Sequence, residues 1–309
     1  MIRNLQTDPY KGISTPIGKF IPTGIPTVDE AINDIVPGSI MILAGRMNGG
    51  KSTFIKQIVA NAISHDVKVF MMHGEGNQEY FINSLYQCVI GNIPEYYDFV
   101  KVNKKYHKEP KKGVLKRLQK WHSDKLTLYK HDEGELIGMT ELFDIIKKQI
   151  VEKKQELIII DNLMSMINPR SAEKNEVQAE FFQRCHNIAE TYSVAIVVVV
   201  HPNKEYRIGA KPSVEHISGT SDIGNKGDTI LWIVREYDQG IIDSGINGSI
   251  EILKIRDYSD IQSVDVHFDK ESLVLCEIAD TRIKRYNFKF DNGENEILID
   301  DSTELPFDL

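Results

Sequence analysis

Residues Gly45 to Ser52, GRMNGGKS, match the pattern G-x-x-x-x-G-K-[ST] and lie between an apolar run, SIMILA, and a helical pattern that starts at Ser52. In this context the glycines let successive backbone N–H groups point at phosphate oxygens. Lys51 would supply positive charge to the β- and γ-phosphates, and the Ser52 hydroxyl would bind Mg²⁺. The alternative is a chance glycine-rich turn, but the flanking strand and helix favour a P-loop. We therefore expect ATP and Mg²⁺ at a cradle formed by Gly45, Arg46, Met47, Asn48, Gly49, Gly50, Lys51, Ser52 and Thr53.

Polar residues at three other strand ends could complete this chemistry. Asp161 ends the run LIIID and would be the second magnesium ligand, unless it only opens a turn. Glu75 follows KVFMMHG and would activate water; a surface carboxylate is the alternative, and Glu79 is the second candidate. His201 follows VAIVVVV and would hydrogen-bond the γ-phosphate, unless its place at a strand end is incidental.

The remaining pattern predicts the elements that position these residues. The apolar runs are nearly continuous in Val, Ile and Leu and alternate with helical segments, which predicts an α/β fold whose mostly parallel sheet is flanked by helices. The last runs, TILWIVRE, SIEILKIR, SVDVHFD and SLVLCEI, alternate more and predict antiparallel strands at the C-terminal edge. The helices are expected at Thr23–Ile35 with Thr27 as N-cap, Ser52–Ser64, Gln78–Val89, Gly113–His122, Met139–Lys153 and Asn175–Tyr192.

Composition sets the wider limits. The chain has 309 residues and a net charge of −8, which disfavours a protein that coats nucleic acid by bulk charge. Its three cysteines form neither a disulfide framework nor a metal-ligand spacing, and no apolar run is long enough to span a membrane. We expect an N-terminal arm at 1–20, one ATPase domain at 21–290, an acidic tail at 291–309 and a cytoplasmic protein of a bacterial or phage-infected cell, with an organelle as the alternative.

Six motifs in order carry a family resemblance: GRMNGGKST, MMHGEGNQE, LIIIDNLMSM, VVVVHPNK, SGTSDIGNKGDTILWIVRE and IEILKIRD. From about Pro22 to Asp257 the chain resembles the RecA-like ATPase domain of hexameric replicative DNA helicases of the DnaB and Twinkle type. The resemblance implies that Glu75 is the catalytic glutamate and that His201 senses the γ-phosphate. It also implies that Lys254 and Arg256 are a basic pair whose arginine acts on ATP bound by the neighbouring subunit; without it, both are solvated charges at a strand edge.

The same resemblance implies a ring, a hexamer, with loops that grip single-stranded DNA. The stretch Pro202–Thr220 would be one such loop, and Asn168–Asn175 a second; a solvated surface loop is the alternative. Residues 1–20 show little of the helical pattern with which other members latch onto the next subunit, so assembly is expected to need DNA, nucleotide or a partner. The candidate DNA contacts are Lys204, Arg207, Lys211, His216, Ser218 and Gly219.

Two charged segments lie outside these motifs. Residues 101–130 hold eleven Lys and Arg and two acids, a balance of +9, and include Tyr106 and Trp121. This segment could contact nucleic acid or a partner, although a solvated face is the more common explanation. The tail has seven acids after residue 290 and could dock on basic pockets of replication proteins or only solubilise the chain.

Together these features predict an ATP-hydrolysing DNA helicase, and the family resemblance implies 5′→3′ movement along single-stranded DNA. Two other classes share the ATP site: a recombinase or mediator that forms filaments, and a RecA-like regulatory ATPase that does not unwind DNA.

Overall fold

The computed structural model describes residues 18–73, 77–102, 105–130, 138–161, 174–207, 209–218, 226–256, 262–278 and 286–288. The described strands form a nine-stranded sheet in the order β11-β10-β9-β8-β1-β7-β6-β2-β5, and β3 and β4 form a separate hairpin. In chain order the elements are α1 Pro26–Ile32, β1 Ile40–Gly45, α2 Lys51–Ser64, β2 Val69–His73, α3 Gln78–Ile90, η1 Pro94–Tyr96, β3 Tyr97–Val102, β4 Lys105–Pro110, α4 Lys112–His122, β5 Leu126–Lys130, α5 Met139–Lys153, β6 Leu157–Asp161, α7 Lys174–Tyr192, β7 Ala195–Val200, η2 Val214–His216, β8 Thr229–Arg235, α9 Gln239–Asp243, β9 Gly248–Ile255, β10 Ser263–Asp269 and β11 Val274–Glu277.

The six strands from β8 to β5 in the sheet order are parallel, and β9, β10 and β11 extend the sheet in antiparallel pairs. This confirms the predicted mostly parallel sheet with an antiparallel C-terminal edge. Parallel strands that are apolar on both faces need helices on both sides.

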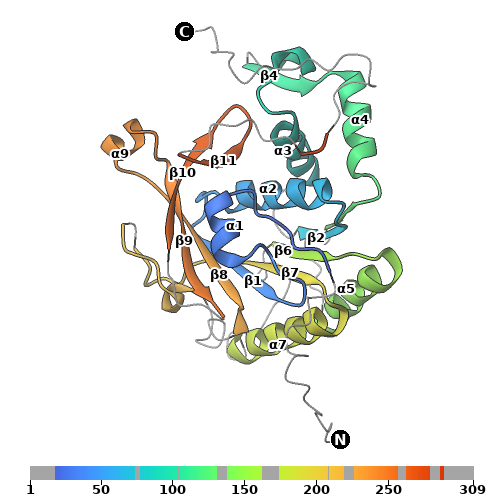
Figure 1. Cartoon of the computed structure of the whole chain (residues 1–309), viewed down its shortest axis with the longest axis vertical. Helices are drawn as coiled ribbons and strands as arrows, with labels where there is room; N and C mark the ends of the chain where they lie inside the picture. The colour runs from blue at the N-terminus through green and yellow to red at the C-terminus, as the bar shows by residue number, and fades with distance from the viewer. Residues whose placement is uncertain are drawn as a thin grey trace, which may run out of the picture.

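Two apolar layers cover the two faces of the sheet. Met41 and Leu43 of β1 pack with α2, α3 and α4, whereas Ile40 and Ile42 of the same strand pack with α5 and α7. Figure 1 shows these two helical layers on opposite sides of the sheet. None of the helices in the described part of the chain is long and apolar enough to cross a membrane.

The start of α1 differs from the prediction, because Thr27 is not its N-cap. Pro26 occupies the first helical turn, and the cap residue is Ile25, whose side chain makes no capping hydrogen bond. The Asp29 carboxylate instead accepts hydrogen bonds from the Thr23 N–H at 2.6 Å, the Thr23 hydroxyl at 2.5 Å and the Gly24 N–H at 3.0 Å. Burial nevertheless raises the pKa of Asp29 to about 6.

Candidate functional site

The P-loop joins the end of β1 to the start of α2. Gly50 has φ +105°, in the left-handed region that favours glycine, and it immediately precedes the first helical residue. At Gly45 a Cβ would lie 2.8 Å from the Ile233 carbonyl oxygen of the adjacent strand β8. The Gly49 N–H donates to the Arg46 carbonyl at 3.0 Å, which tightens the turn. The glycines of the motif are therefore needed for the close approach to β8 and for the entry into α2.

Lys51 is almost completely buried within this loop, with 7% of its surface exposed. Its ammonium donates to the carbonyl oxygens of Gly45 at 2.7 Å and Arg46 at 2.8 Å, and lies 3.4 Å from His201 Nδ1. The sequence placed Lys51 and His201 in different motifs, and the fold brings their side chains together. A cation held by two neutral carbonyls can exchange them for phosphate oxygens, which make stronger charge-assisted contacts.

The polar residues that end or follow the parallel strands lie together at the carboxyl ends of these strands. Asp161 of β6 pairs with His73 of β2, and His201 directly follows β7, which lies between β1 and β6. Glu75 comes two residues after His73 but lies outside the described residues. The hydroxyl of exposed Ser52 and the carboxylate of Asp161 are the oxygen ligands that Mg²⁺ prefers, so the residues present fit the predicted metal.

Arg256 and Lys254 lie at the opposite end of the sheet from the P-loop. Strand β9 runs antiparallel to β8 and pairs Ile255 with Thr229, whereas the P-loop residue Gly45 pairs with Ile233. Four residues of β8 therefore separate the two ends, a distance of about 13 Å along the strand. The Arg256 guanidinium contacts the Asp228 carboxylate at 2.7 Å, and its side chain remains 46% exposed. Arg256 thus cannot reach the P-loop of the same chain.

Lys254 lies beside this ion pair. Burial lowers its pKa, and the nearby Arg256 guanidinium lowers it further, while Asp228 opposes both effects. The second oxygen of the Asp228 carboxylate accepts a hydrogen bond from the Ile40 N–H at 2.8 Å. Asp228 therefore fastens the basic pair to the start of β1, and the sequence motif gave no sign of this anchor.

The predicted DNA loop after His201 has a hydrogen-bonded stem. The Ser218 N–H donates to the His201 carbonyl at 2.9 Å, and the Asn203 N–H donates to the His216 carbonyl at 2.8 Å. Pro202 and Ile217 form an antiparallel bridge between these two bonds. The stem therefore continues directly from the strand whose end contacts Lys51.

Basic side chains lie on the exposed part of this loop. Lys204, Arg207 and Lys211 are exposed, whereas Tyr206 turns inward and its ring lies 4.7 Å from that of buried Trp232 in β8. Of the other candidate contacts, His216 and Ser218 form part of the stem, and Gly219 lies outside the described residues. The second predicted loop, Asn168–Asn175, has only its last two residues among those described, at the start of α7.

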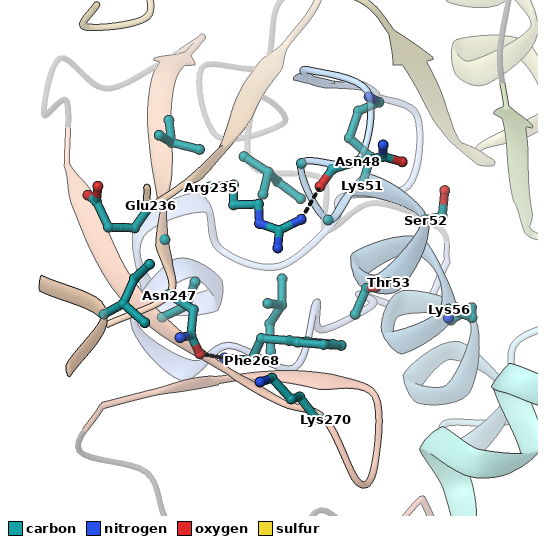
Figure 2. Close-up of a pocket in the computed structure, with 18 of the residues that line it drawn as sticks. Asn48, Lys51, Ser52, Thr53, Lys56, Arg235, Glu236, Asn247, Phe268 and Lys270 are labelled. Carbon is teal, nitrogen blue, oxygen red and sulfur yellow. Dashed lines mark hydrogen bonds between the residues drawn. The ribbon is translucent and has the colours of Figure 1, made fainter. Parts of the chain in front are cut away.

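A cavity of about 550 Å³ opens beside the P-loop, between the first turns of α2 and the strands β8 to β10. Figure 2 shows Arg235 extending toward the P-loop, where its guanidinium donates to the Asn48 carbonyl at 3.4 Å. On the far wall the Phe268 N–H donates to the Asn247 side-chain oxygen at 2.7 Å. No sequence motif indicated this cavity, whose described lining includes Thr53, Lys56, Tyr80, Arg235, Asn247, Phe268 and Lys270.

Comparison with known proteins places the chain in a family. The family model for an AAA domain matches residues 6–207, about two thirds of the sequence. The chain belongs to the AAA domain family. No curated protein matches it.

Two solved structures share the fold of this AAA domain. The ATPase domain of G40-P superimposes with a TM-score of 0.70 at 17% identity, covering 87% of this chain and 95% of that domain. A DnaB-like replicative helicase, solved in a study of its interactions with primase, superimposes with a TM-score of 0.68 at 16% identity and covers 89% of this chain and 68% of the helicase. The AAA domain therefore has the RecA-like fold of DnaB-like helicase ATPase domains, as the motifs predicted.

Proposed function

We propose that the chain is the ATP-hydrolysing motor of a ring-shaped, hexameric DNA helicase that moves 5′→3′ along single-stranded DNA. The observation that carries this proposal is the placement of the P-loop and of Arg256 at opposite ends of one sheet. A site that needs both parts is completed only between two subunits. The fold likeness to a replicative helicase and to a second ATPase domain supports the same assembly.

The first half of the site binds and positions ATP. Lys51 would release its two carbonyl partners and contact the β- and γ-phosphates, while the N–H groups at the start of α2 face the same oxygens. Ser52 and Asp161 would hold Mg²⁺, which neutralises charge on the phosphates when bound. Glu75 would orient the attacking water.

The neighbouring cavity would receive the rest of the nucleotide. It opens from Thr53 at the P-loop to the Phe268 ring and Lys270 on the far wall, and its volume of about 550 Å³ suits a nucleoside. The aromatic face of Phe268 could stack on the base, and Arg235 extends toward the P-loop on the opposite side of the cavity. This arrangement predicts that Phe268 contributes to nucleotide affinity and not to the chemical step.

The second half of the site comes from the adjacent subunit. A guanidinium at the transferred phosphoryl group stabilises charge that develops in the transition state, worth about 10³ to 10⁵ in rate. Arg256 is half exposed and already oriented by Asp228, so it can be presented without reorganising the core. Hydrolysis would then depend on assembly.

The DNA loop would couple hydrolysis to movement. Loss of the γ-phosphate changes the surroundings of Lys51 and of His201, which lie 3.4 Å apart. The stem from His201 to Ser218 transmits that change to Lys204, Arg207 and Lys211, whose contacts with phosphates would be independent of sequence.

One experiment tests the whole proposal: unwinding of a forked duplex, with native mass measured in ATP and single-stranded DNA. We expect unwinding only by an oligomer and none by Lys51→Ala. Filament growth with strand pairing and no unwinding would favour a recombinase or mediator. ATP hydrolysis that is indifferent to single-stranded DNA would favour a regulatory ATPase.

A further inference from the structure

Helix α4 presents a row of lysines on the face that does not pack on the core. Val114 and Leu118 are buried against the α2 and α3 layer. Lys112, Lys116 and Lys120 follow one another at every fourth position and are all exposed. Residues at this spacing lie on one side of a helix. Residues 112–122 contain four Lys and Arg and no acid, so nothing within the helix offsets the charge.

The helix is held firmly in place. The Tyr86 hydroxyl of α3 lies 2.8 Å from His122 Nε2, at the C-terminal end of α4. The Trp121 ring meets Phe288 edge-on, with ring centroids 6.3 Å apart. At the other end, the Lys111 N–H donates to the Tyr96 carbonyl at 2.9 Å. The lysine row is therefore a fixed surface.

Other lysines of this region have partners on the core. Lys108 forms an ion pair with Glu271 after β10, and Lys125 contacts Asp66 at 3.0 Å. These pairs explain the two lysines as attachments of the β3–β4 hairpin and of the end of α4 to the rest of the domain. In contrast, none of the three lysines of the row forms an ion pair with another described residue. Their charge is available to a ligand.

We propose that the row Lys112, Lys116 and Lys120 binds the phosphodiester backbone of a nucleic acid. Successive lysines are about 6 Å apart along the helix axis, so the row spans about 12 Å. A nucleic-acid strand offers one phosphate every ~3.4 Å of axis, so the row can meet three or four of them. An evenly spaced line of cations without acceptor groups matches a uniform line of anions better than the mixed surface of a protein.

This site goes beyond the proposed function. Helix α4 precedes β5, which is one edge of the sheet, whereas the nucleotide cavity lies on the side of β8 to β10. Figure 1 shows α4 on the outer side of α3, away from β8 and β9. A strand bound to α4 would therefore be held apart from the DNA loop after His201.

The test measures binding of a labelled oligonucleotide, single-stranded and as a duplex, over a range of salt concentrations. The variant carries Lys112→Ala, Lys116→Ala and Lys120→Ala. Its matched control carries Lys147→Ala, Lys148→Ala and Lys153→Ala on α5, three exposed lysines on the other helical layer. Hydrolysis without DNA and thermal unfolding show that both variants are folded.

For single strands, the slope of log binding constant against log salt concentration should be shallower by about 2 in the α4 variant, since each lost phosphate contact removes ~0.7. The same variant should bind single strands up to about a hundredfold more weakly than the parent at roughly 0.1 M salt. The α5 variant should bind as the parent does, and a variant with arginine at all three α4 positions should retain affinity. The duplex arm shows which form the site prefers.

Two results would overturn the proposal: normal oligonucleotide binding by the α4 variant, or equal weakening of the α4 and α5 variants. Normal oligonucleotide binding together with lost binding of a synthetic acidic peptide of residues 291–309 would assign the row to that peptide instead. The proposed function fails separately: it is contradicted if the parent protein, with its α4 lysines intact, neither unwinds a forked duplex nor hydrolyses ATP.

Discussion

Mixing two inactive variants should restore ATP hydrolysis if the catalytic site lies between subunits. Arg256→Ala keeps its P-loop, and Lys51→Ala keeps its arginine at the other end of the sheet. In a mixed oligomer, an Arg256→Ala subunit whose neighbour is Lys51→Ala has one complete site. Each variant alone has none.

The expected magnitude follows from the assembly. At equal amounts and random order, about one interface in four joins an intact P-loop to an intact arginine, so about a quarter of the parental turnover should return. Arg256→Ala alone should be about 10³-fold slower or worse, because it lacks the charge that stabilises the transferred phosphoryl group.

Loss of stability cannot account for such a defect. Removing Arg256 leaves the buried Asp228 carboxylate without its ion pair but keeps its hydrogen bond from the Ile40 N–H. Removing one partner of a buried ion pair costs about 3–5 kcal/mol, and Asp228 keeps its backbone hydrogen bond, so the loss stays below the ~5–15 kcal/mol stability of a typical domain. The variant should remain folded and should bind nucleotide.

The assay is steady-state ATP hydrolysis with single-stranded DNA, on mixtures whose mixed oligomers are confirmed by native mass. Full turnover by Arg256→Ala alone would refute the shared site. So would an inactive mixture in which mixed oligomers form, because the arginine would then act within its own subunit.

Three further predictions concern other parts of the chain. His201→Ala should keep nucleotide binding but lose stimulation of hydrolysis by single-stranded DNA, whereas His201→Gln should keep both; equal stimulation of all three forms would contradict the coupling through the loop stem. Phe268→Ala should raise the KM for ATP roughly tenfold, for a stacking contribution of about 1–2 kcal/mol, with kcat unchanged; a fall in kcat alone would place Phe268 elsewhere in the mechanism. Because burial raises the pKa of Asp29 to about 6 from 3.8, the folded state favours its protonated form, and its contribution to stability is present below pH 3.8 and lost as the pH rises through about 6. The free energy of unfolding of the parent should therefore fall relative to that of Asp29→Asn by on the order of 2–3 kcal/mol over this pH range, as measured by chemical denaturation. If the unfolding free energies of the two proteins changed in parallel with pH, the pKa of Asp29 would not be raised in the folded state.

The sequence predicted the central sheet well because its residues there obey one local rule. Apolar runs such as LIIID and VAIVVVV need helices on both faces of the sheet. Because these strands are parallel, the polar residues at their carboxyl ends then lie at the same end of the sheet. The bounds of α5 agree with the prediction, and those of α2, α3 and α7 differ from it by one residue at one end.

Features that depend on distant pairings were not predicted. The β3–β4 hairpin pairs Tyr97–Val102 with Lys105–Pro110, a basic stretch without clear alternation, so its strands were missed. The cavity beside the P-loop is closed by the strands β8 to β10, which lie far from the P-loop in the chain, and their antiparallel register fixes which side chains line it. The position of Arg256 relative to the P-loop has the same origin, since the antiparallel prediction for SIEILKIR gave no register against β8.

The stem of the DNA loop grows from β7, which lies in the interior of the sheet and is buried along its whole length. Such a strand cannot slide without disturbing both helical layers, and Tyr206 ties the loop to β8 as well. A loop attached to so rigid a strand can move little relative to the rest of its own subunit. We therefore expect each step along the DNA to come from displacement of a whole subunit relative to its neighbour, with the loop moving as a fixed part of that subunit.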